Sequence, residues 1–187
     1  HARGFWGNRA ERRVAWASVV ALARAATILR QHLGVEKTWK APGDAVNWFT
    51  TGGWEVDRHG ERLFRDDAGL PGGLQGVRAR LRRAYLRHID RCNAAFSELL
   101  HQHGIETIDL PFAGELLAKV RPAKEPFAVL VLDACRFDLG CRIAEALDGG
   151  EPSRRSEVQA ARAPLPSITP LGMPFALADD ASHIRIE

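Results

Sequence analysis

The sequence lacks the features of a membrane-spanning or a secreted protein. No apolar run approaches the roughly 18 residues that cross a bilayer, and the N-terminus has no signal-peptide pattern. The composition, 45% hydrophobic and 26% charged without a low-complexity segment, is typical of a soluble globular protein. Because the first residue is His1 rather than Met, and "HIRIE" at the end carries no closing signal, we expect a piece of a longer protein.

Cysteine is scarce. The three cysteines, Cys92, Cys135 and Cys141, have neither the spacing of a metal-binding motif nor that of a disulfide framework. This pattern predicts a protein of the reducing cytoplasm.

Several common catalytic motifs are also absent. No G-x-S-x-G surrounds a serine, and neither G-x-x-x-x-G-K-S/T nor a dinucleotide-binding glycine pattern occurs. These absences argue against a serine hydrolase of the α/β type and against the usual nucleotide-binding enzymes. No internal repeat is evident.

The two halves of the chain differ in charge. Residues 1–104 contain 17 basic and 10 acidic side chains, a balance of +7, whereas residues 105–187 contain 9 and 13, a balance of −4. The hydrophobic periodicity changes at the same place, near Gly104. We therefore predict two regions, residues 1–104 and residues 105–187.

The first region has a helical pattern. Apolar residues at spacings of three and four predict one helix over about residues 10–33 and another over about residues 74–103. Gly34 and Gly104 stand where these helices would end. The segment between them is rich in glycine, proline and tryptophan, which predicts short helices and loops.

The second region alternates predicted strands and helices. The run "PFAVLVLD" (126–133) is apolar without polar alternation, which is typical of a parallel strand covered on both faces. A helix closed by glycines follows at 136–150, "EVQAARAPLPS" (157–167) suggests a second strand, and "TPLGMPFAL" (169–177) opens another helical turn. This order predicts an α/β fold with a right-handed crossover in a parallel sheet.

Asp133 is predicted to stand at the carboxyl end of a strand, where α/β sheets carry their chemistry. A carboxylate there binds a metal, accepts a phosphoryl group or acts as a base; the alternative is that it caps the next helix. Two phosphate chemistries fit poorly. A haloacid-dehalogenase-type phosphatase needs a second Asp where this chain has Cys135, and a response-regulator receiver needs an earlier acidic pair, which "FAGELLAKVRP" does not supply.

Ser167 and Thr169 lie between two prolines in "PLPSITPLGM". Pro166 and Pro170 favour an extended backbone that leads into a helix start. A hydroxyl beside the unpaired N–H groups of a helix start favours an anionic ligand such as phosphate. The alternative is a hydroxyl N-cap and nothing more.

Two further clusters have more than one interpretation. Six arginines lie within residues 78–91, and the nucleic-acid candidates among them are Arg80, Arg83 and Arg87. Such a helix face contacts nucleic-acid phosphates, or it faces solvent or pairs with the acidic second region. Near the end, the D-D-x-x-H pattern that finishes at His183 is a metal candidate or an exposed polar loop.

The segment "VLVLDACRFDL" followed by "LPSITPLGMPFAL" resembles the PglZ family, a branch of the alkaline phosphatase superfamily associated with BREX phage-defence systems. Upstream, "NWFTTGGWEVDR" and "RRAYLRHIDRCNAAFSELLHQHG" resemble the helical segment that precedes the PglZ core. The resemblance covers most of residues 45–178. It implies a helical region followed by the first strands of an alkaline-phosphatase-like parallel sheet, truncated in this chain.

The resemblance also implies roles for particular residues. It makes Asp133 a metal ligand and Thr169 the nucleophile and a metal ligand, with Ser167 as the alternative hydroxyl. Arg136 matches the arginine of the family's D-x-x-R segment, where it orients Asp133 or a phosphate, and Cys135 is expected to serve packing. Two divalent ions, zinc-like, would activate the Thr169 hydroxyl and stabilise the attacking and leaving oxygens, through a phospho-threonine intermediate. The family's remaining Asp and His ligands lie well downstream, so we expect half a metal site and an inactive chain.

The implied parent is a metal-dependent phosphatase or phosphodiesterase of a bacterial phage-defence system, with other BREX proteins as its partners. Two alternatives stand beside it: a non-enzymatic scaffold or interaction module of a defence complex, and DNA binding through the arginine-rich helix. A sheet cut after its second or third strand exposes an apolar edge, which predicts self-association.

Overall fold

A computed structural model describes residues 10–65, 70–120, 128–133, 135–150, 155–164 and 169–178. The chain divides into two compact units, His1–Ile108 and Asp109–Glu187. The sequence pattern changes four residues before this division, at Gly104.

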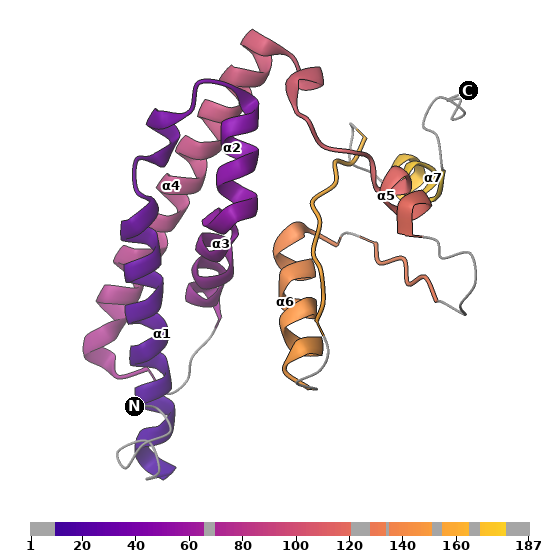
Figure 1. The fold of residues 1–187 in the computed structure, drawn as a ribbon. Helices are drawn as coiled ribbons and strands as arrows, with labels where there is room; N and C mark the ends of the chain where they lie inside the picture. The colour runs from indigo at the N-terminus through magenta and orange to yellow at the C-terminus, as the bar shows by residue number, and fades with distance from the viewer. Residues whose placement is uncertain are drawn as a thin grey trace. The chain divides into compact units, whose positions relative to one another are not determined.

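All regular elements in the described part of the first unit are helices, with turns and bends between some of them (Figure 1). The two predicted long helices are present as α1 (Ala10–His32) and α4 (Gly72–His103). The short elements between and after them are η1 (Val35–Thr38), α2 (Pro42–Trp48), η2 (Phe49–Gly53), α3 (Trp54–Gly60), η3 (Glu61–Phe64) and η4 (Ile105–Thr107). Across the described residues of both units, no helix combines the length and the apolar composition that crossing a membrane requires.

Glycine ends the two long helices. Gly34 follows α1 with a φ of 82°, and Gly104 follows α4 with a φ of 81°. Residues with a side chain rarely adopt positive φ, so glycine is the residue that lets the chain leave the helix there. The Gly104 N–H still donates to the Leu100 carbonyl over 2.9 Å, which satisfies one of the last carbonyls of α4.

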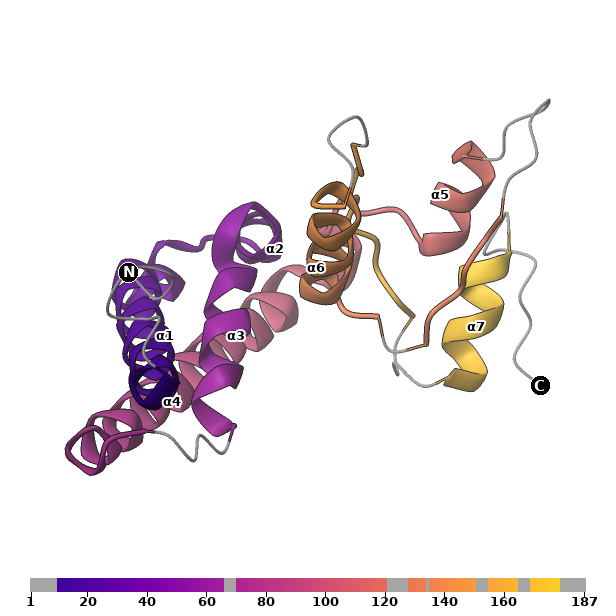
Figure 2. The ribbon, with the colours of Figure 1, turned by 90° about the horizontal axis from the view of Figure 1, so that it is seen from below.

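The hydrophobic core of the first unit is shared by α1, η3 and α4, and both ribbon views show α1, α3 and α4 side by side (Figure 2). Its members are apolar side chains spaced three, four or seven apart on the long helices, together with the segment between α3 and α4. They are Leu22, Ala25, Leu63 and Leu70, with Leu74, Leu81 and Tyr85 packed against them.

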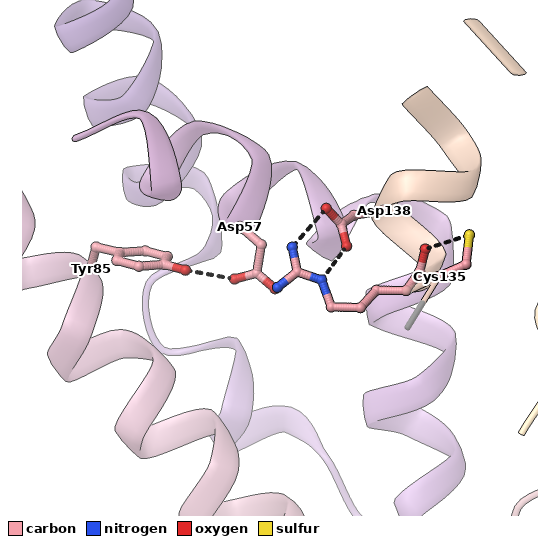
Figure 3. Close-up of polar contacts among 5 residues, drawn as sticks. Asp57, Tyr85, Cys135 and Asp138 are labelled. Atoms are coloured by element: carbon pink, nitrogen blue, oxygen red, sulfur yellow. Dashed lines mark hydrogen bonds and ion pairs between the residues drawn. The ribbon is translucent and has the colours of Figure 1, made fainter. Parts of the chain in front are cut away.

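A close approach between α3 and α4 depends on Gly60. The ring of Tyr85 lies where a Cβ on Gly60 would be. The Tyr85 hydroxyl donates a hydrogen bond of 3.0 Å to Asp57 Oδ1, three residues earlier on α3 (Figure 3). The missing side chain therefore lets the ring pack against α3 while its polar end stays paired.

Three side chains with polar or ionisable atoms are buried together on the α4 side of the first unit. His88 is fully buried, and Cys92 and Glu36 are 7% and 9% exposed. Burial lowers the pKa of His88 and raises the pKa of the Cys92 thiol to about 12. Buried groups of this kind are retained only where something satisfies them.

The second unit contains three helices among its described residues: α5 (Ala113–Val120), α6 (Phe137–Asp148) and α7 (Thr169–Leu177). α5 packs against α7, as Figure 2 shows. Just before α5, the ring of Phe112 lies 5.4 Å from the ring of Phe175 on α7. These contacts bring the start of α5 and the residue before it against the end of α7.

The predicted parallel α/β sheet is wrong, because no described residue belongs to a β-strand. Residues 128–132 have no ladder partner, and Leu130 is 81% exposed. Within the described ranges the sole β-type pairing is an isolated parallel bridge between Phe112 and Arg162. An apolar run becomes a strand only when a neighbouring backbone takes up its N–H and C=O groups, and no described residue provides such a neighbour for this segment. The predicted self-association depended on a sheet edge that these residues do not form.

Candidate active site

A cavity of about 990 Å³ lies in the second unit. Its lining comes from the end of the extended segment at 131–133, the start of α6, residues 158–164 and α7. The lining side chains with polar chemistry include Asp133, Arg136, Arg162 and Thr169. Three of these four, all except Arg162, were predicted from the sequence as site residues.

Asp133 and Thr169 are joined by a hydrogen bond although 36 residues separate them in the chain. Thr169 Oγ1 donates to Asp133 Oδ2 over 3.0 Å. Thr169 is the first residue of α7, and Asp133 ends the extended segment that precedes α6. Both residues are exposed, so a ligand in the cavity reaches the hydroxyl and its carboxylate partner together.

Arg136 lines the cavity, and its guanidinium forms an ion pair with the carboxylate of Asp138. Arg136 Nε lies 3.0 Å from Asp138 Oδ1 and Nη2 lies 3.2 Å from Asp138 Oδ2, a bidentate pair drawn in Figure 3. Asp138 is 1% exposed, whereas the Arg136 side chain is 59% exposed. A buried carboxylate requires such a partner, so Asp138 fixes the orientation of a cation at the cavity wall.

Arg162 is a cavity residue that the sequence did not single out. Its guanidinium stacks on the ring of Phe112, 4.3 Å from the ring centre. Its Nε atom is buried without a hydrogen-bond partner in the described part of the chain. A buried donor of this kind is unsatisfied until an acceptor arrives, which an anionic ligand supplies. No local motif marks Arg162, because its role depends on its pairing with the segment before α5.

The described lining of the cavity does not by itself provide enough ligands for the two metal ions that the PglZ resemblance implies. Two zinc-type ions require several carboxylate or imidazole ligands each. Among the described lining residues, Asp133 is the sole carboxylate and no histidine contributes. The Asp133–Thr169 pair therefore supplies a small part of such a ligand set.

Of the remaining predicted residues, the structure describes Cys135 but not Ser167 or His183. Cys135, expected to serve packing, is exposed and lines the cavity. Its sulfur lies 4.0 Å from the Arg136 carbonyl, a weak contact (Figure 3). Ser167 and the D-D-x-x-H pattern at 179–183 lie outside the described residues.

The arginines of α4 divide into two groups. Arg78, Arg82 and Arg91 have intramolecular partners: the Arg65 carbonyl at 3.2 Å, the Phe64 ring at 4.5 Å, and the Glu36 carboxylate at 3.3 Å. Arg80, Arg83 and Arg87 are exposed, and their spacing of three and four places them on one helix face. The three predicted nucleic-acid candidates thus form a solvent-facing row.

Comparison with known protein families, with curated proteins and with solved structures finds no match.

Proposed function

We propose that the cavity of the second unit binds a phosphate ester and that Asp133 and Thr169 carry the chemistry of its hydrolysis. The chain would then contribute this part of a metal-dependent phosphatase or phosphodiesterase, as the PglZ resemblance implies. The observation that carries the proposal is the Asp133–Thr169 hydrogen bond across 36 residues, at a cavity that two arginines also line.

The direction of that hydrogen bond suits Thr169 as a nucleophile. As the Thr169 Oγ1–phosphorus bond forms and the bond from phosphorus to the leaving alcohol breaks, the hydroxyl proton passes to the Asp133 carboxylate. The leaving alcohol takes a proton from solvent, and water then hydrolyses the phospho-threonine. Arg136 and Arg162 favour binding of the negatively charged ester, because guanidinium donors match phosphate oxygens.

Metal ions enter this proposal through the resemblance. Bound ions would lower the pKa of the attacking hydroxyl and stabilise charge on the phosphate. Asp133 and Thr169 would be their ligands in this chain, and further ligands would come from outside the described residues. We expect no turnover from the chain by itself, since the donors around the cavity do not complete a metal site.

The proposed compartment and the proposed role in phage defence rest on different arguments. All three cysteines are free thiols, which suits a reducing cytoplasm. Participation in phage defence beside other BREX proteins depends on the sequence resemblance alone.

Phosphate-ester binding by the 187-residue chain tests the cavity. Calorimetric titration with phenyl phosphate should show binding that Arg162→Met weakens about tenfold, because one charge-assisted contact contributes ~1.5 kcal/mol or more. Arg155 is exposed and does not line the cavity, so Arg155→Met is the matched control. Equal binding by all three proteins, or none by the parent chain, would contradict the proposed cavity function.

The catalytic roles are tested by nitrophenyl phosphate hydrolysis in the protein with its full ligand set. Thr169→Ala should abolish turnover, Thr169→Ser should retain it in part, and Asp133→Asn should lower it by about 10²–10⁴-fold. If Thr169→Ala stays active, the nucleophile is wrongly assigned. If the 187-residue chain itself hydrolyses the ester with zinc and loses this in Thr169→Ala, its metal site is complete, contrary to our expectation.

A second candidate function, binding of nucleic acid, is favoured by the exposed row of Arg80, Arg83 and Arg87. Each phosphate contact releases a counterion, so the affinity should fall steeply with salt. Charge reversal of all three to Glu should abolish binding of a DNA duplex in a gel-shift titration. The control reverses Arg24, Arg30 and Lys37, which are also exposed, and makes the same change in net charge. Similar loss in both triple variants would indicate a general charge effect and count against a specific site.

A further inference from the structure

The first unit brings a carboxylate, an imidazole and a thiol together in its interior. His88 and Cys92 are one turn apart on α4, and Glu36 comes from η1, which packs against α4. One ligand atom from each residue lies within 4.8 Å of the other two. The i, i+4 spacing gives His88 and Cys92 one helix face, and the packing of η1 brings the third donor.

The spacing of the two α4 donors is that of ligands to a shared metal ion. Cys92 Sγ lies 3.6 Å from His88 Nε2 and 3.9 Å from His88 Nδ1. A tetrahedral zinc ion with a Zn–S bond of about 2.3 Å and a Zn–N bond of about 2.1 Å places its sulfur and nitrogen ligands about 3.6 Å apart. The sulfur is almost equally far from both ring nitrogens, so an ion binds between the two side chains once the His88 imidazole turns to point one nitrogen at it, while the backbone of α4 keeps its place.

Glu36 has an oxygen atom with no partner. Its Oε1 lies 3.3 Å from Arg91 Nε, but Oε2 is buried without a hydrogen-bond partner among the described residues. The Glu36 side chain is 7% exposed, so water does not readily satisfy this atom. Leaving a buried carboxylate oxygen unpaired costs about 1–3 kcal/mol or more, whereas a cation at the cluster satisfies it.

The surroundings shield the cluster from solvent. The Trp48 ring lies edge-on to the His88 ring, with centres 6.1 Å apart, and Trp48 Nε1 donates to His32 Nδ1 over 2.9 Å. The Trp39 ring packs against the Trp48 ring, with centres 5.4 Å apart. Arg91 is half-exposed and lies beside the Glu36 carboxylate. A carboxylate and a thiolate together neutralise a divalent ion, so the site adds no net charge to the core.

We propose that Glu36, His88 and Cys92 bind one divalent transition-metal ion of the zinc class that fastens η1 to α4. The mixed oxygen, nitrogen and sulfur donors select such an ion over magnesium or calcium, which prefer oxygen ligands throughout. The ion has a structural role here, because its ligands are buried and join two elements of one helical unit. This site is independent of the cavity in the second unit and of the phosphate-ester chemistry proposed there.

Metal content and cobalt spectroscopy of the 187-residue chain test the proposal. The chain purified with zinc and dialysed should retain about one ion per molecule, and its unfolding temperature should fall when a chelator removes that ion. With cobalt in place of zinc, a thiolate-to-cobalt charge-transfer band should appear. Bound cobalt without that band, or no retained ion, would overturn the assignment even if every cluster variant failed to fold.

Matched variants separate this cluster from adventitious binding. Cys92→Ala and His88→Ala should lose the ion and the cobalt band, with helix content checked by circular dichroism. Cys141→Ala and His101→Ala remove one thiol and one exposed imidazole elsewhere, and they should keep both. Loss of the ion in His101→Ala but not in His88→Ala would place binding at the exposed histidines near the end of α4, and would refute the proposed site.

Discussion

The contact between Gly60 and Tyr85 depends on the absence of one carbon atom. Gly60→Ala puts a methyl group into the Tyr85 ring, which must move away from Asp57 and from the core. We expect a loss of about 1–3 kcal/mol in the free energy of unfolding, measured by urea denaturation. Gly43 lies in α2, and nothing lies within 4 Å of where its Cβ would be, so Gly43→Ala should raise stability by about 0.5–1 kcal/mol. Equal effects at the two glycines would contradict this packing.

The buried histidines make stability depend on pH. Burial is the largest cause that lowers the pKa of His59 below its usual 6.5; Arg62, Arg58 and Arg24 lower it further, and Glu55 opposes them. The folded pKa is thus below the unfolded one, so the unfolded chain binds more protons between the two values. The full stability is present above pH 6.5 and is lost as pH falls through the folded pKa.

Urea denaturation at a series of pH values checks this expectation. The free energy of unfolding should rise with pH just below 6.5, and His59→Gln should make the rise shallower without removing it. The remainder comes from His32, whose pKa burial also lowers. A steeper slope in His59→Gln would show that the pKa of His59 is raised in the folded protein.

The sequence predicted three site residues of the cavity but none of the three residues of the proposed metal cluster. Asp133 was predicted from its place at the end of an expected strand, and Thr169 from its place at a helix start between two prolines. The structure joins the two by a hydrogen bond, although the strand is absent among the described residues. The Glu36–His88–Cys92 cluster was missed, because a search for paired cysteines overlooks a His-x-x-x-Cys face completed by a distant carboxylate. The available signal was a histidine and a cysteine four apart on the apolar stripe of a predicted helix.

At the scale of elements, helices were predictable and strands were not. Helix hydrogen bonds close within the segment, so local periodicity and glycine stops suffice to place α1 and α4. A strand depends on a partner from elsewhere in the chain, which periodicity does not identify. The run at 128–132 shows this limit, because its apolar residues have strand character but no partner among the described residues.

A substitution at Leu130 distinguishes the observed segment from the predicted buried strand. Leu130 is 81% exposed, so Leu130→Ala should change the free energy of unfolding by less than about 0.5 kcal/mol. A buried leucine in a sheet would cost about 2–5 kcal/mol. Phe175→Ala, in the same unit, removes the ring that packs on Phe112 and should be clearly destabilising. A large loss from Leu130→Ala would restore the case for a buried strand.

At the scale of the whole molecule, the two units carry different kinds of chemistry. The first unit contains a helical core and the proposed metal cluster, and the second contains the cavity with Asp133 and Thr169. The charge balance also differs, at +7 for residues 1–104 and −4 for residues 105–187. Each unit therefore has its own stabilising contacts, which predicts separable folding.

Residues 1–108 expressed alone test this separation. They contain the whole core of Leu22, Ala25, Leu63 and Leu70 as well as all three proposed metal ligands. We expect a cooperatively unfolding helical protein that retains about one zinc ion per chain, measured by circular dichroism and elemental analysis. The His88→Ala variant of the same segment is the control, and it should lose the ion. If residues 1–108 fail to fold while the 187-residue chain folds, the first unit depends on the second and the two are one cooperative unit.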